Sequence, residues 1–228
     1  MIRYFSPILI CLCYIGILFS QNTYPIILIH GFLGWGRDEM AGYYYWGGKT
    51  DLESELKSVG YEVYTVSVGP ISPNWDRAIE SFYQIKGGQV DYGNEKTEKY
   101  GIIQRPSGKN YPGFYPQWDA EHPVHLIGHS QGGSTAKMLE VLLQSSIADE
   151  DSPLLANVYT GWIGSVTTIS TPHNGTTLVP LMLDVFPFAL NLAPWFGGIE
   201  NEKIDELYSF DLEHWNLEKQ PNESIKEY

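Results

Sequence analysis

One short stretch of this sequence admits very few backbone conformations. It is the pentapeptide Gly128-His129-Ser130-Gln131-Gly132, which an apolar run precedes and a run of helical periodicity follows. A chain that turns from strand to helix within so few residues brings backbone against backbone, so side chains two positions either side of the serine must be nearly absent. The pattern predicts a tight strand-to-helix turn with Ser130 at its tip.

Strand and helix patterns alternate on both sides of this turn. The predicted strands are Tyr24–His30, Tyr61–Val68, Pro123–Gly128 and Trp162–Ile169. The predicted helices run from a capping box at Thr50–Glu53 to Gly60, from Ser72 to Gly87, and from Gly132 to Ser145. Such alternation is typical of a mostly parallel sheet flanked by helices, so we expect an α/β fold.

Apolar side chains at helical spacing predict the buried face of each helix. These faces are Leu52, Leu56 and Val59; Ile79, Phe82 and Ile85; and Met138, Val141 and Leu142. The polar, Gly- and Pro-containing stretch from Gln89 to Gln117 is expected to be an excursion from the sheet.

The N-terminus has the pattern of a secretory signal peptide. Arg3 precedes an apolar run from Ile8 to Phe19, and the small residue Ser20 follows it. We expect cleavage near Ser20, which leaves one secreted domain over 21–228 with no permanent membrane span; an uncleaved anchor is the alternative. Both cysteines, Cys11 and Cys13, lie in the leader, so the mature domain has no disulfide.

Charge and composition restrict the partners. A formal net charge of −13 repels nucleic acid and gains little from anionic membranes, so any lipid contact should be apolar in origin. The 16 Tyr and 7 Trp suit apolar or sugar-like ligands, or simply an aromatic-rich core. Asn174 and Asn222 fit the N-glycosylation acceptor pattern.

The region from Thr177 to Gly198 combines many apolar residues with Pro180, Pro187 and Pro194. A plain core helix does not usually tolerate so many prolines. The segment is therefore expected to be a lid-like apolar flap beside an active site.

The pentapeptide matches G-x-S-x-G, the elbow at which α/β hydrolases present a nucleophilic serine. Ser130 is thus the candidate nucleophile, although a serine in a turn can also be purely structural. His30-Gly31-Phe32 follows the first buried strand, where this fold places a loop facing the nucleophile. The backbone N–H groups of Phe32 and Gln131 are the expected oxyanion donors.

Together these segments resemble the large secreted lipases of the Bacillus-type and staphylococcal group. The matching segments are Ile29–Gly36, Tyr45–Gly48, Asn74–Ala78, Val90–Gly93, Tyr111–Gly113, Gly128–Gly133, Thr171–Gly175 and Pro221–Ser224. The resemblance implies an α/β hydrolase that cleaves acylglycerol esters. It also implies that Thr177–Gly198 is a lid over the acyl pocket. We expect this chain to act at a lipid–water interface and to need no cofactor.

The sequence departs from these lipases at their zinc site, which two Asp and two His form. Asp76 falls on the first Asp position, Lys96 and Ile102 fall on the His positions, and Glu213 falls on the second Asp. Lysine and isoleucine cannot replace imidazole as zinc ligands. We therefore predict that no metal binds, and that Asp76 lies at the helix surface or in local hydrogen bonds.

A second departure concerns the catalytic acid and base. In the similar lipases both residues, and a calcium site, lie beyond the equivalent of residue 228. Only His173 and His214 follow Ser130, and neither lies at the position of a triad histidine. The sheet is expected to be incomplete on its C-terminal side, with an open edge, poor solubility and little activity for this truncated chain.

The leading functional hypothesis is a triacylglycerol lipase or broad carboxylesterase that forms an acyl-enzyme. Another α/β-hydrolase activity, such as a thioesterase or acyltransferase, would use the same nucleophile. The alternative from a different class is a secreted lipid-binding protein that has lost catalysis.

Overall fold

The computed structural model describes residues 23–176, 208–217 and 220. The predicted signal peptide (1–20), the predicted lid from Thr177 to Gly198 and the acceptor Asn222 lie outside these residues. Asn174 is exposed.

A four-stranded sheet with all strands parallel forms the centre of the molecule, in the order β2-β1-β5-β6. The strands are β1 (Ile26–Ile29), β2 (Val63–Val66), β5 (Val124–His129) and β6 (Ile163–Ile169). Ile29, the last residue of β1, pairs with Val66 on one side and Gly128 on the other, so the carboxyl ends of three strands meet. All four predicted strands are confirmed, and the α/β class with them.

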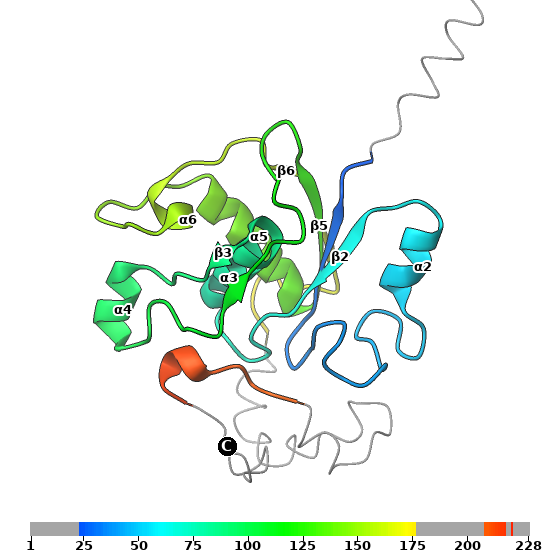
Figure 1. Ribbon diagram of the computed structural model, residues 1–228, viewed down its shortest axis with the longest axis horizontal. Helices are drawn as coiled ribbons and strands as arrows, with labels where there is room; N and C mark the ends of the chain where they lie inside the picture. Colours follow the sequence, from blue (N-terminus) through cyan, green and yellow to red (C-terminus); the bar gives the residue numbers. More distant parts are fainter. Residues whose placement is uncertain (1–22, 177–207, 218–219, 221–228) are drawn as a thin grey trace, which may run out of the picture.

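Helices cover both faces of the sheet (Figure 1). The helices are α2 (Leu52–Ser58), α3 (Asn74–Lys86), α5 (Gln131–Leu143) and the short α6 (Pro153–Ala156). Figure 1 shows α3 and α5 on one side of the strands and α2 on the other. No helix in the described ranges is long and apolar enough to span a membrane.

Helix α3 buries the face that its sequence predicts. Ile79, Phe82 and Ile85 are all at most 3% exposed, and Gly87 ends the helix with a φ of 98°. A side chain at Gly87 would be strained there, so glycine is the favoured residue. The same helix also buries several charged residues, which the apolar periodicity does not indicate.

The predicted faces of α2 and α5 need correction. In α2 the cap is Asp51, whose carboxylate accepts the Ser54 N–H, and Val59 is 70% exposed just beyond the helix. In α5, Val141 is 55% exposed because it lies two residues, about 200°, around the helix from the buried Leu139. The face of α5 that meets the sheet and α3 consists of Gly132, Thr135, Ala136, Leu139, Leu142 and Leu143.

The predicted excursion is confirmed as a small subdomain. It contains β3 (Gly88–Gln89) and β4 (Asn110–Tyr111), which pair antiparallel, and α4 (Asn94–Tyr100). A distant segment with the short 3-10 helix η1 (Glu213–Trp215) packs on it, because the Ile103 N–H donates to the His214 carbonyl at 2.7 Å. In Figure 1 this orange segment lies below α4.

Candidate active site

The predicted elbow lies directly between β5 and α5. Ser130 has φ 53° and ψ −124°, a conformation that L-residues rarely adopt. A Cβ on Gly128 would lie 2.3 Å from the Gly132 carbonyl carbon, and one on Gly132 would lie 2.1 Å from the Ile29 oxygen. Both glycines are therefore sterically required, as the spacing predicts. Ser130 itself is half-buried.

The loop after β1 lies against this elbow. A Cβ on Gly31 would be 2.8 Å from the Ser130 Cβ. The Gly31 N–H donates to the Tyr45 hydroxyl oxygen at 2.9 Å, and the Leu33 N–H donates to the Pro70 carbonyl at 2.9 Å. Between them, the Phe32 N–H has no acceptor among the described residues, and neither does the N–H of Gln131 at the start of α5.

His30, at the start of this loop, is fully buried. Its Nε2 accepts the Val68 N–H at 3.2 Å, and its Nδ1 lies 2.9 Å from the Gly31 carbonyl oxygen, so a proton on Nδ1 satisfies both contacts. Burial, reinforced by the charge of Arg77, lowers the pKa of His30 to about 3. The imidazole is therefore neutral and structural rather than a proton carrier.

Arg77 is a site residue that sequence reasoning missed. Its guanidinium is fully buried and donates to the His30 carbonyl, to the Gly69 carbonyl at 2.7 Å and to the Thr135 hydroxyl at 3.0 Å. It thereby joins the loop after β1 to α3 and α5. Burial lowers the pKa of Arg77 to about 10. No periodicity marks it, because a charged residue on a helix is normally assigned to the solvent face.

A second connection runs through the middle of the pentapeptide. The Tyr45 hydroxyl, which accepts the Gly31 N–H, also hydrogen-bonds the His129 Nδ1 at 2.5 Å. Trp46 packs edge-on against the His129 ring, with a centroid distance of 6.4 Å. The loop and the elbow are thus fixed to each other by one phenol.

An apolar cluster borders the loop after β1. Its buried members are Leu33, Trp35, Met40, Tyr208 and Phe210, with Phe32, Tyr43, Tyr45, Ile71 and Leu212 packed against them. It is separate from the main core under the sheet. Phe32 packs on this cluster and carries one of the two N–H groups that lack an acceptor in the described part of the chain, so the apolar cluster and the polar site share a loop.

The two histidines after Ser130 have other partners. The His173 Nε2 lies 3.0 Å from the Thr168 hydroxyl, and the buried His214 places its Nε2 3.1 Å from an oxygen of Asp76. In the described part of the chain no histidine hydrogen-bonds the Ser130 hydroxyl. The location of the catalytic acid and base stays a prediction.

Asp76 itself corrects the sequence-based expectation. It is fully buried rather than at a helix surface, and it pairs with Lys96. Across residues 23–176 and 208–217, no three His, Cys, Asp or Glu side chains gather closely enough to hold a metal ion.

The family model described as "Lipase-like, C-terminal domain" matches residues 22–228. The chain belongs to this lipase-like family. A lipase of Staphylococcus epidermidis is 38% identical over 224 residues, which are 91% of this chain and 32% of that protein. Lipase 1 of Staphylococcus aureus is 37% identical, with the same coverage. The lipase-like chain therefore spans about a third of these relatives.

Solved structures agree with this assignment. EstA from Clostridium botulinum is 42% identical with a TM-score of 0.80, and the match covers 90% of this chain and 49% of that one. Lipase 1 from Pelosinus fermentans is 40% identical with a TM-score of 0.80 over 90% and 56% of the two chains. Staphylococcus hyicus lipase is 34% identical with a TM-score of 0.71 over 90% and 55%. The lipase-like chain has the α/β-hydrolase fold.

Proposed function

We propose that this chain supplies the nucleophile and oxyanion hole of a secreted carboxylic ester hydrolase, of the triacylglycerol lipase kind. The observation that carries the proposal is the backbone of Ser130, held at φ 53° between a buried strand and a helix, beside two N–H groups that have no acceptor within the described residues. Such strain persists only where the surrounding structure enforces it, and it is typical of functional positions.

The chemistry follows from these groups. The Ser130 oxygen attacks the ester carbonyl, the alcohol leaves, and an acyl-enzyme forms that water then hydrolyses. The Phe32 and Gln131 N–H groups stabilise the negative oxygen of each tetrahedral intermediate. A general base takes the serine proton and returns it to the leaving alcohol. We place this base, a histidine oriented by an acid, beyond residue 228.

The substrate class is a lipid ester. The relatives are named lipases, and Phe32, which carries one of the proposed oxyanion donors, packs on a buried apolar cluster with Leu33 and Trp35, so the site has an apolar side. A thioesterase or acyltransferase would use the same elbow, so the acyl acceptor has to be measured. We place the reaction outside the cell, at a lipid–water interface, after removal of residues 1–20.

A fluorophosphonate probe tests the proposal, because it reacts with a serine only when the nucleophile is activated. The protein expressed from its complete gene should be labelled stoichiometrically at Ser130 and should hydrolyse triacylglycerols. The Ser130→Ala variant should show neither. A folded protein that binds lipid but leaves Ser130 unlabelled would establish the non-catalytic alternative instead.

A further inference from the structure

Helix α3 buries two carboxylates one turn apart. Asp76 and Glu80 are both fully buried, in a helix whose neighbouring residues Ile79 and Phe82 belong to the main core. A buried carboxylate is strongly unfavourable unless it is hydrogen-bonded and paired with a cation. The fold around α3 therefore needs a positive charge at each position.

The excursion between β3 and β4 provides both charges. Lys96 of α4 pairs with an oxygen of Asp76, and the Lys109 ammonium donates to Glu80 at 2.8 Å. The two lysine side chains are only 12% and 6% exposed. Each of the two buried anions on this helix thus meets a largely buried cation that belongs to the polypeptide.

The segment 208–217 joins both pairs. The His214 Nε2 lies 3.1 Å from the second oxygen of Asp76, and Asp211 accepts from Lys109 at 2.5 Å. Asp76 therefore connects α3, α4 and η1, three elements that are far apart in the sequence. Asp76 thus acts as a noncovalent cross-link between these three elements.

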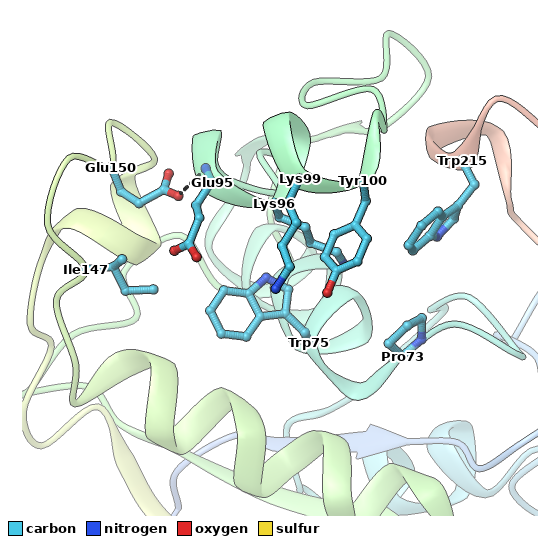
Figure 2. Close-up of a pocket in the computed structure, with 9 residues that line it drawn as sticks. All are labelled: Pro73, Trp75, Glu95, Lys96, Lys99, Tyr100, Ile147, Glu150 and Trp215. Carbon is cyan, nitrogen blue, oxygen red and sulfur yellow. Dashed lines mark hydrogen bonds between the residues drawn. The ribbon is translucent and has the colours of Figure 1, made fainter.

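Aromatic rings complete the surroundings of Lys96. Its Nζ lies 5.2 Å from the ring centroid of Trp215 and 5.9 Å from that of Tyr92, which stacks on His214 at 4.3 Å. Figure 2 shows Lys96 and Lys99 on α4 above Trp75, with Trp215 on the facing segment. These rings favour a cation at this point.

A zinc ion, which the family resemblance implies at this place, does not fit these residues. One oxygen of Asp76 faces the Lys96 ammonium in an ion pair, the other hydrogen-bonds the His214 ring, and an ammonium cannot coordinate a metal. Ile102 is 4% exposed, and its side chain has no nitrogen, oxygen or sulfur atom that could bind a metal. A divalent ion would also be repelled by the charge of Lys96.

We propose that the Lys96 ammonium replaces the metal ion, so that this region cross-links α3, α4 and η1 without zinc. The inference is independent of the role of Ser130. Its first test uses the full 228-residue chain and two measurements, metal content and melting temperature. Purified protein should contain far less than stoichiometric zinc, and neither EDTA nor added ZnCl₂ should shift Tm. Stoichiometric zinc, or a Tm that EDTA lowers, would overturn the proposal.

A charge-removal variant tests the cross-link itself. Lys96→Met leaves Asp76 buried without its cation and should lower Tm by roughly 10 °C. Lys99→Met is the matched control, because Lys99 lies one turn further along α4 and is exposed. Its Tm should stay near that of the wild type. Equal Tm values for the two variants would contradict the cross-link.

The converse variant restores a metal ligand set. Lys96→His combined with Ile102→His supplies imidazoles at the two positions that correspond, by the resemblance, to the zinc-binding histidines. Zinc should then raise Tm of this double variant, as binding to the folded state alone requires. The wild type should not respond. A double variant whose Tm zinc does not raise would show that this place was never equivalent to a zinc site.

Discussion

Tyr45 touches both halves of the candidate active site through one oxygen. Its hydroxyl accepts the Gly31 N–H and shares a hydrogen bond with His129, the neighbour of the proposed nucleophile. With the Gly31 N–H engaged in this way, the next N–H, that of Phe32, has no acceptor among residues 23–176 and 208–217. We interpret Tyr45 as a residue that positions the proposed oxyanion loop.

Tyr45→Phe should therefore reduce ester hydrolysis more than it reduces stability. Loss of one such hydrogen bond costs about 1–3 kcal/mol, so we expect kcat to fall roughly tenfold or more while KM changes little. Steady-state kinetics of the complete protein and a melting curve check this. Tyr44→Phe is the matched control, since Tyr44 precedes Tyr45 and contacts Arg37 instead. A kcat equal to that of the control would refute the positioning role.

His30 makes the same loop sensitive to acid. Its pKa is lowered to about 3 by burial, so below the ordinary pKa of 6.5 the unfolded chain binds a proton that the folded chain does not. Stability from His30 is then present above pH 6.5 and is lost as pH falls, by at most about 1.4 kcal/mol per pH unit. Burial also lowers the pKa of His214, to about 4, so His214 likewise makes the folded state less stable as pH falls.

Urea unfolding between pH 7 and pH 5 measures this effect. Burial and the charge of Glu80 raise the pKa of Asp211 to about 7, which opposes the histidines over the same range. The difference in unfolding free energy between wild type and His30→Gln isolates the contribution of the His30 imidazole. The variant should lose less unfolding free energy on acidification, whereas His122→Gln, at an exposed histidine, should follow the wild type. Parallel curves for wild type and His30→Gln would disprove the assignment.

At the scale of elements, the elbow depends on close contact between β1, β5 and α5. Gly132→Ala places a methyl group 2.1 Å from the Ile29 oxygen, and Gly128→Ala places one 2.3 Å from the Gly132 carbonyl carbon. The obstacles are backbone atoms, which cannot rotate away. We expect each variant to lose about 3 kcal/mol of unfolding free energy or to fail to fold.

Gly108→Ala is the control for these variants, because a Cβ at Gly108 meets nothing within 4 Å. Its unfolding free energy should stay within about 0.5 kcal/mol of the wild type. Denaturant titration of the three variants provides the comparison. If Gly132→Ala were as stable as Gly108→Ala, the close approach of the elbow to β1 would be wrong.

Periodicity predicts the elements whose burial pattern is visible in the local spacing of apolar residues. The strands, the start of α3 near Pro73 and the glycines of the elbow follow from side-chain spacing and sterics alone. The predicted buried face of α5 was wrong at Val141, because contacts of the helix with both the sheet and α3 determine which of its residues are buried. Arg77 and Tyr45 were missed as site residues, since their partners lie 47 and 84 residues away, at His30 and His129.

At the scale of the whole molecule, the outer edge of β6 has no neighbouring strand among the described residues. Parallel sheets are normally covered on both faces, yet β6 is largely exposed, with Ile169 at 43%. Unpaired N–H and C=O groups along such an edge can pair with another molecule. The expectation of poor solubility for the isolated 21–228 segment rests on this edge.

We therefore expect the 21–228 segment to associate as its concentration rises, and Thr167→Lys, on the exposed edge, to reduce that association. Thr160→Lys adds the same charge in an exposed turn outside the strand and should have little effect. Size-exclusion chromatography with light scattering distinguishes them. A wild-type segment that stays monomeric at all concentrations would contradict the expectation.

The ion pair between Lys96 and Asp76 has a consequence for how the protein matures. On the proposed secretory route, a counter-charge that belongs to the polypeptide is exported with it, whereas a metal ion has to be captured afterwards from the surrounding medium. A chain built this way can reach its folded state in fluids stripped of trace elements, at a rate that its own sequence sets.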